Sequence, residues 1–223
     1  MENEIFKEKY EAMIFQISSN KQIEINFKID NFYELDQDDY LFDKKRLVSK
    51  FFIPEVFFKY YITNDFLKLS WNFRIENFNA SGGDFNLKSF ILFLNNPLDT
   101  AFKANVSLDD AKLLKDGYRF FDRPNEYDRA AIKITDGKIE EKVYFINELN
   151  IPQKMVLTYP EYMEQVIKIK GLQHWQYLFI EGLKFDDVQF GLERELGERL
   201  KMIKEVFPDE DFTEFFKLFE GLK

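Results

Sequence analysis

The segment from residue 67 to residue 75 carries the strictest pattern in the chain. Its apolar residues take every second position, and they are Leu67, Leu69, Trp71, Phe73 and Ile75. Successive side chains of a β-strand point to opposite faces, so the pattern predicts a strand with one buried and one polar face. This is the clearest strand of the 223-residue chain.

Turn and cap residues mark other elements. Asp136-Gly137 favours the positive φ angles of a tight turn, which predicts a β-hairpin over residues 130–146. The capping-box pattern that begins at Thr158 predicts a helix that ends at Gly171.

Apolar residues at helical spacing predict most of the remaining structure. Helices are expected over residues 4–18, 53–63, 188–206 and 211–219, and strands over residues 23–29 and 118–121. Ser81-Gly82-Gly83 is interpreted as a turn before a strand that runs toward Leu94. This order predicts an α+β fold with a single, mostly antiparallel sheet and packed helices. Residues 1–185 are expected to form this domain. Residues 186–223 are expected to form a helical extension that packs on the domain or projects from it.

Composition excludes several functional classes. The chain has no cysteine, which removes disulfide frameworks, thiolate metal sites and cysteine nucleophiles. His174 is the only histidine, so any histidine-based catalysis depends on it, and a structural role for a partly buried, hydrogen-bonded imidazole is favoured. The net charge of −9 argues against an extended nucleic-acid interface. The negative net charge is expected either to maintain solubility or to promote the capture of a basic partner.

The chain carries no apolar run long enough for a membrane span, and its N-terminal residues lack the apolar stretch of a secretory signal. A cytoplasmic location is therefore expected.

The acidic run at residues 36–39 invites a calcium interpretation. Its members are Asp36, Asp38 and Asp39. A calcium loop needs glycine at its sixth position and glutamate at its twelfth, where this chain has Leu41 and Leu47. No metal or cofactor is predicted. Asp109-Asp110 and Asp186-Asp187 are interpreted as helix N-caps.

The segment from residue 53 to residue 73 resembles the SUKH superfamily, which includes Smi/Knr-type cell-wall regulators and many bacterial immunity proteins. The resemblance rests on an Ile-Pro start, an aromatic helix, a polar turn and a following strand. Segments 118–137 and 157–179 are similar to the family's central strands and closing helix. The residues that match the family pattern or anchor its core are Ile53, Pro54, Phe57, Tyr60, Tyr61, Asn64, Trp71 and Trp175. Asp65 stands where the family usually has glycine.

The resemblance implies a non-enzymatic binding fold with no catalytic residues. The leading hypothesis is an immunity protein that neutralises a cognate toxin domain by binding it, with no small-molecule substrate. The alternative is a regulatory or scaffold subunit of a larger complex, and a third hypothesis is a hydrolase that uses two facing carboxylates. The partner surface is predicted to include Asp36, Asp38, Asp39, Phe212 and Phe216. The Phe212 helix is expected either to pack on the core or to dock in a partner's groove.

Overall fold

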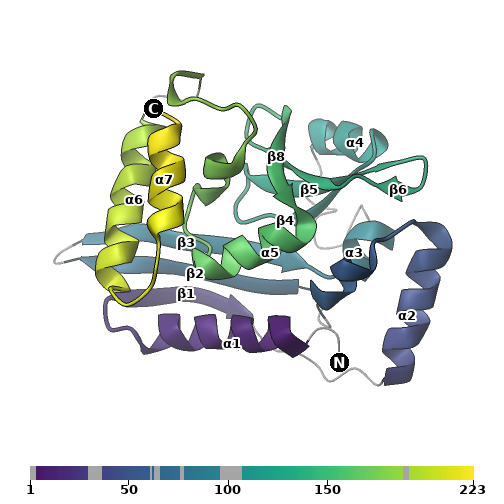
Figure 1. Ribbon diagram of the computed structural model, residues 1–223, viewed down its shortest axis with the longest axis horizontal. Helices are drawn as coiled ribbons and strands as arrows, with labels where there is room; N and C mark the ends of the chain where they lie inside the picture. Colours follow the sequence, from purple (N-terminus) through teal and green to yellow (C-terminus); the bar gives the residue numbers. More distant parts are fainter. Residues whose placement is uncertain are drawn as a thin grey trace.

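The computed structural model describes residues 4–29, 37–60, 62, 66–75, 78–95, 107–187 and 191–223. Within these residues the chain forms one eight-stranded, mostly antiparallel sheet with helices packed against it, so the predicted α+β class is confirmed (Figure 1). Along the sheet the strands run in the order β1-β2-β3-β4-β5-β7-β8, and β6 pairs with β5.

The strands are β1 (Ile23–Ile29), β2 (Phe66–Ile75), β3 (Phe78–Lys88), β4 (Tyr118–Asp122), β5 (Arg129–Thr135), β6 (Lys138–Ile139), β7 (Lys142–Ile146) and β8 (Pro152–Thr158). The α-helices are α1 (Glu4–Ser19), α2 (Gln37–Lys50), α3 (Phe90–Asn95), α4 (Leu108–Lys115), α5 (Tyr159–Lys168), α6 (Leu192–Val206) and α7 (Thr213–Gly221). The described residues also form the 3-10 helices η1 (Glu55–Tyr60), η2 (Trp175–Phe179) and η3 (Phe185–Asp187).

The elements predicted from local signals form as expected. Strand β2 buries the alternating apolar residues of the 67–73 segment, and β5 turns into β6 at Asp136 and Gly137, which both have positive φ. Thr158 caps α5 in a complete capping box with Glu161. In each case the determining residues lie within a few positions of one another, so local chemistry decides the structure.

Several boundaries differ from the prediction. The 53–63 segment forms the shorter 3-10 helix η1, which buries Phe57 and Phe58. Strand β3 ends at Lys88, and α3 replaces the predicted continuation toward Leu94. Strand β8 was not predicted. Tyr61, Asn64 and Asp36 lie outside the described residues.

The interpretation of Gly82-Gly83 as a turn is wrong. Both glycines lie inside β3, at a bulge where the β2–β3 register shifts next to Trp71. A Cβ atom on Gly83 would lie 2.7 Å from the carbonyl oxygen of Gly171, so the missing side chain permits a close approach between two backbones. Distant residues therefore set the role of this glycine pair.

At the bulge, residues 170–173 bond to β3 where β4 does not pair with it. Strands β3 and β4 pair only at Leu87 and Asp122. Beyond that point, Gly171 accepts a backbone hydrogen bond from Asp84 (2.9 Å), and Gln173 donates one to Gly82 (2.9 Å). The Trp71 indole donates to the carbonyl of Lys170 (2.9 Å). Residues 170–173 are thereby fixed against the edge of β3.

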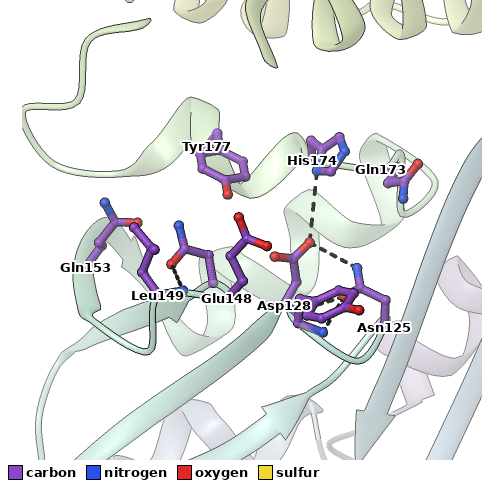
Figure 2. Close-up of a pocket in the computed structure, with 10 residues that line it drawn as sticks. Asn125, Asp128, Glu148, Leu149, Gln153, Gln173, His174 and Tyr177 are labelled. Carbon is purple, nitrogen blue, oxygen red and sulfur yellow. Dashed lines mark hydrogen bonds and ion pairs between the residues drawn. The ribbon is translucent and has the colours of Figure 1, made fainter. Parts of the chain in front are cut away.

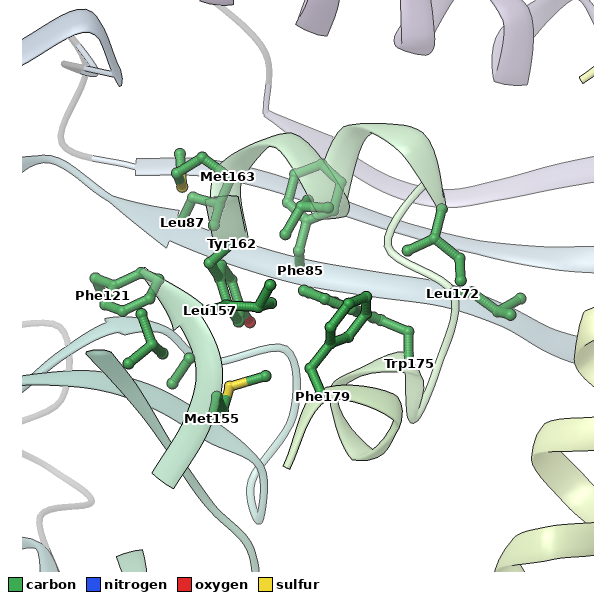
Figure 3. Packing of buried hydrophobic residues seen from close by; sticks show 14 of the residues in the cluster. Phe85, Leu87, Phe121, Met155, Leu157, Tyr162, Met163, Leu172, Trp175 and Phe179 are labelled. Carbon is green, nitrogen blue, oxygen red and sulfur yellow. The ribbon is translucent and has the colours of Figure 1, made fainter. Parts of the chain in front are cut away.

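Aromatic rings fill much of the core between α5, η2 and the sheet. Figure 3 shows Phe85, Phe121 and Trp175 in this layer, close to Tyr162. The Tyr162 ring meets Phe121 edge-on, with centroids 5.0 Å apart. The Tyr162 hydroxyl donates to buried Asp122 (2.7 Å). Trp71 and Trp175 are both fully buried, so their predicted place in the core is confirmed.

The C-terminal helices α6 and α7 lie side by side and pack on this core (Figure 1). Phe215 meets Phe179 of η2 edge-on, and Phe185 donates a backbone hydrogen bond to Leu222. On the other side of the pair, the Asn20 amide donates to the carbonyl of Val206 (2.8 Å). These helices therefore share the apolar core of the sheet and do not project from it.

Candidate functional site

A pocket of about 370 Å³ opens where three segments meet that lie far apart in the sequence. It is formed by the loop between β4 and β5, the loop between β7 and β8, and residues 173–177 (Figure 2). The lining comprises two acids, Asp128 and Glu148, together with four side-chain amides, two tyrosines, His174 and Leu149. We call this cavity the Asp128 pocket.

The β4–β5 loop is shaped by one asparagine. The Asn125 side-chain oxygen accepts hydrogen bonds from the backbone N–H groups of Tyr127 and Asp128, both at 2.8 Å. Its amide nitrogen donates to the Asp128 carboxylate (3.0 Å). An asparagine that replaces backbone acceptors in this way fixes a tight turn, and here it holds the Asp128 carboxylate at the pocket wall.

The β7–β8 loop presents the second acid. The Asn147 side-chain oxygen accepts from the backbone N–H of Leu149 (3.1 Å), and Asn150 adopts a positive φ of 57°. This tight turn leaves Glu148 and Leu149 exposed. The Glu148 and Asp128 carboxylates both point toward the segment that carries His174 and Tyr177 (Figure 2).

His174 reaches the pocket because residues 170–173 are tied to β3. It adopts a left-handed φ of 68° directly before η2. Its Nδ1 lies 3.9 Å from Asp128 Oδ2, and its Nε2 lies 3.8 Å from Glu195 Oε2. Both separations exceed hydrogen-bonding distance.

Burial, followed by the nearby charge of Arg199, lowers the pKa of His174, although Asp128 and Glu195 act in the opposite direction. The imidazole is therefore neutral at neutral pH. It is partly buried, as predicted, but Nδ1 makes no hydrogen bond within the described structure. A general base needs an orienting partner, and no carboxylate of the described residues lies within hydrogen-bonding distance of the ring.

The aromatic side of the pocket stays uncharged. Burial raises the pKa of Tyr177 to about 12, so its hydroxyl remains protonated at neutral pH. Two carboxylates line the pocket, and a pair of facing carboxylates is what the hydrolase hypothesis requires. The described lining contains no serine, threonine or cysteine nucleophile. Over the described part of the chain, no group of three histidine or acidic side chains is placed to hold a metal ion.

Among the residues predicted to bind a partner, none of those that the structure describes lines the Asp128 pocket. Asp38 and Asp39 lie in the first turn of α2. Phe212 is buried in the core of this chain, so it presents no surface to a partner. Phe216 is half-buried at the outer side of the α6–α7 pair, and its role in partner binding stays a prediction.

The interpretation of Asp109-Asp110 as N-caps is wrong. Ser107 caps α4, where its hydroxyl accepts from the backbone N–H of Asp110 (3.0 Å). The Asp110 carboxylate instead accepts hydrogen bonds from Arg129 and Arg123. Asp186 and Asp187 lie in the short helix η3, and the N-cap of the following helix α6 is Gly191, so neither aspartate caps α6.

Asp128, Glu148 and Tyr177 are not among the residues predicted from the sequence, because the three come from separate segments. A usable signal was present, since both loops contain an asparagine next to acidic and apolar residues between two strands. These are Asn125 to Asp128 and Asn147 to Leu149. Loops that connect the strands of a rigid sheet are common places for binding residues.

Comparisons of the chain with protein-family models, with curated proteins and with solved structures found no match. The resemblance to the SUKH superfamily therefore stays a prediction. None of the helices in the described ranges is both long and apolar enough to cross a membrane.

Proposed function

We propose that this chain is a non-enzymatic binding protein that captures a basic protein partner, with a toxin domain that it neutralises by occlusion as the leading candidate. The proposed contact surface is the loop face, defined as Tyr127 and Asp128 of the β4–β5 loop with Glu148, Leu149 and Ile151 of the β7–β8 loop. The resemblance in the 53–73 segment motivates the immunity role.

The observation that carries the proposal is the exposure of large apolar side chains among acids on this face. Tyr127, Leu149 and Ile151 remain 58%, 68% and 62% exposed. Tyr127 and Leu149 form part of the rim of the Asp128 pocket, beside its two carboxylates. Apolar and aromatic residues at the centre of a contact, with charges around them, are typical of protein interfaces.

Charge supports a basic partner. The chain carries a net charge of −9, and no lysine or arginine appears in the described lining of the pocket. Complementary charge accelerates association and selects among partners. The alternative surface on α7 is less suitable, since Phe212, Phe215 and Phe219 are buried within the chain itself.

The test is co-expression with a toxin domain encoded beside this gene. We expect restored growth and a complex that survives size-exclusion chromatography. Leu149→Asp, which places a charge at the apolar centre, should abolish both. Phe15→Asp is the matched control, because Phe15 is equally exposed on α1, which contacts the opposite edge strand β1 (Figure 1).

Two results would decide against the proposal. If the toxin neither binds nor is neutralised, the immunity role is wrong. If Leu149→Asp and Phe15→Asp have equal effects on binding, the loop face is not the contact surface. A stable complex with a non-toxic partner would instead favour the regulatory or scaffold role.

A further inference from the structure

Asp128 is a nearly buried carboxylate without a direct cationic partner among the described residues, although the charge of the neighbouring Arg129 acts on it. Its residue surface is 8% exposed. Its partners among the described residues are the Asn125 amide and, at 3.9 Å, the His174 imidazole. No lysine or arginine of the described chain forms an ion pair with it. A buried carboxylate without a cation is energetically costly, so the site favours a positive charge from outside the chain.

Glu148 adds a second negative charge to the same cavity. It is exposed, lines the Asp128 pocket and forms no ion pair among the described residues. Both carboxylates line the same cavity, so a cation bound there is attracted by both of them.

The pocket also has hydrogen-bond acceptors that its own chain leaves unused. The buried Oε1 of Gln153 has no partner among the described residues, and neither has Nδ1 of His174. A neutral imidazole offers one acceptor nitrogen, and each carboxylate offers two acceptor oxygens. The two carboxylates and the unpartnered Gln153 oxygen can therefore accept from a ligand, and a guanidinium group is a planar donor with five N–H bonds and no acceptor.

The rings of the pocket favour the same ligand. Tyr177 and Tyr127 both contribute to the lining, and a guanidinium stacks on aromatic faces, which a hydrated ammonium does less well. The volume of about 370 Å³ lies at the small end of ligand pockets, a size that suits one long side chain.

We propose that the Asp128 pocket binds an arginine side chain of the basic protein partner, with Asp128 and Glu148 receiving the guanidinium and Tyr177 lying against it. This inference rests on the proposed function, because it names the group of that partner which enters the loop face. The partner's arginine would supply the direct ion pair that no described lysine or arginine of this chain forms with Asp128.

The experiment uses the whole chain and a small probe, so it does not depend on finding the partner. N-acetyl-arginine methylamide is titrated into labelled protein and followed by NMR. We expect saturable shifts at Tyr177, His174 and their neighbours, with a dissociation constant on the order of 1 mM for so small a ligand. The citrulline analogue has the same shape without the charge, and it should bind at least about tenfold more weakly.

Variants locate the binding. Asp128→Asn and Glu148→Gln should each weaken binding about fivefold or more, because each removes one charge-assisted contact. Glu126→Gln is the matched control, since Glu126 is an exposed acid on the same loop outside the pocket lining, and it should stay within about twofold. Glu148 is exposed, so Glu148→Gln remains informative if Asp128→Asn impairs folding.

The inference is overturned if the arginine probe gives no shifts at about 20 mM, if the citrulline probe binds equally well, or if Glu148→Gln behaves like Glu126→Gln. These failures differ from failure of the proposed function. A chain that binds its protein partner but not the arginine probe keeps the function and loses the arginine pocket. A chain that binds the probe but no neighbouring toxin keeps the pocket and loses the immunity role.

Discussion

Asp110 and Asp128 are two nearly buried aspartates, and they differ in whether the chain pairs them directly with arginine. Asp110 is 2% exposed, and its two carboxylate oxygens accept from Arg129 and Arg123. Asp128 is 8% exposed and is contacted by an amide and a neutral imidazole. Asp128 directly precedes Arg129 in the chain, yet the Arg129 guanidinium forms its ion pair with the distant Asp110.

Strand geometry explains the difference. Arg129 is the first residue of β5, where successive side chains alternate between the two faces of the sheet. Its side chain therefore turns toward α4, where it reaches Asp110 and also the carbonyl of Asn147 (3.0 Å). Asp128 faces the other way, into the pocket. A carboxylate that is paired within the chain holds the fold together, and one that is left unpaired at a cavity is available to a ligand.

The prediction with the largest expected effect compares how much Asp110 and Asp128 contribute to the free energy of unfolding. Asp110→Asn leaves Arg129 buried without its counter-ion, which should lower the free energy of unfolding by about 3–5 kcal/mol. Asp128→Asn keeps an oxygen that can accept from Asn125, so it should change that free energy by less than about 1 kcal/mol. Urea unfolding measures both variants. Equal losses would mean that Asp128 is also a structural residue.

A third carboxylate sharpens the comparison. Asp84 on β3 is half-buried, does not line the Asp128 pocket, and has one oxygen without a hydrogen-bond partner among the described residues. Burial, followed by the charge of Asp122, raises the pKa of Asp84 from 3.8 to about 7. Such a group binds its proton more tightly in the folded chain, so its contribution to stability is complete below pH 3.8 and is lost as the pH rises through about 7.

Asparagine does not ionise, so Asp84→Asn removes the loss of stability that accompanies ionisation of Asp84. The variant should exceed the natural chain in unfolding free energy by about 1–3 kcal/mol at about pH 8, with a smaller difference at about pH 4. Denaturant unfolding across this pH range measures the effect. The exposed carboxyl of Asp116 provides a control, and Asp116→Asn should show no such trend. If the gain in unfolding free energy were the same at every pH, it would not arise from the ionisation of Asp84.

The sequence predicts this fold where the determinants are local, and fails where they are distant. In residues 67–75 and at the Thr158 cap, residues within a few positions of one another determine the structure. Gly82-Gly83 looks like a turn because glycine often marks turns, but Trp71 and Gly171 decide its role from 11 or more positions away. The Asp128 pocket is harder still, since its three segments meet only after β3, β5 and β8 have formed the sheet. Asp128 and Arg129 look like a sequence-adjacent ion pair, and only strand alternation separates them.

The smallest expected effect tests whether His174 competes with the ligand for Asp128. The pKa of His174 is lowered by burial and by Arg199, and Asp128 and Glu195 raise it. The imidazole is therefore neutral near pH 7 and gains charge only as the pH falls below the usual histidine range, which places a cation beside Asp128. Protonation also removes the acceptor nitrogen. Binding of the arginine probe should weaken by about twofold between about pH 7 and about pH 5.

His174→Asn should abolish that decline, and asparagine suits the position because it tolerates the left-handed backbone found there. NMR titration of the probe at both pH values, with the natural chain and the variant, measures the difference. If the variant shows the same decline, protonation of a carboxylate and not of His174 controls the pocket, and Glu148→Gln would identify which carboxylate it is. If neither chain shows a decline, the imidazole does not compete with the ligand, and Asp128 stays available to it across this range.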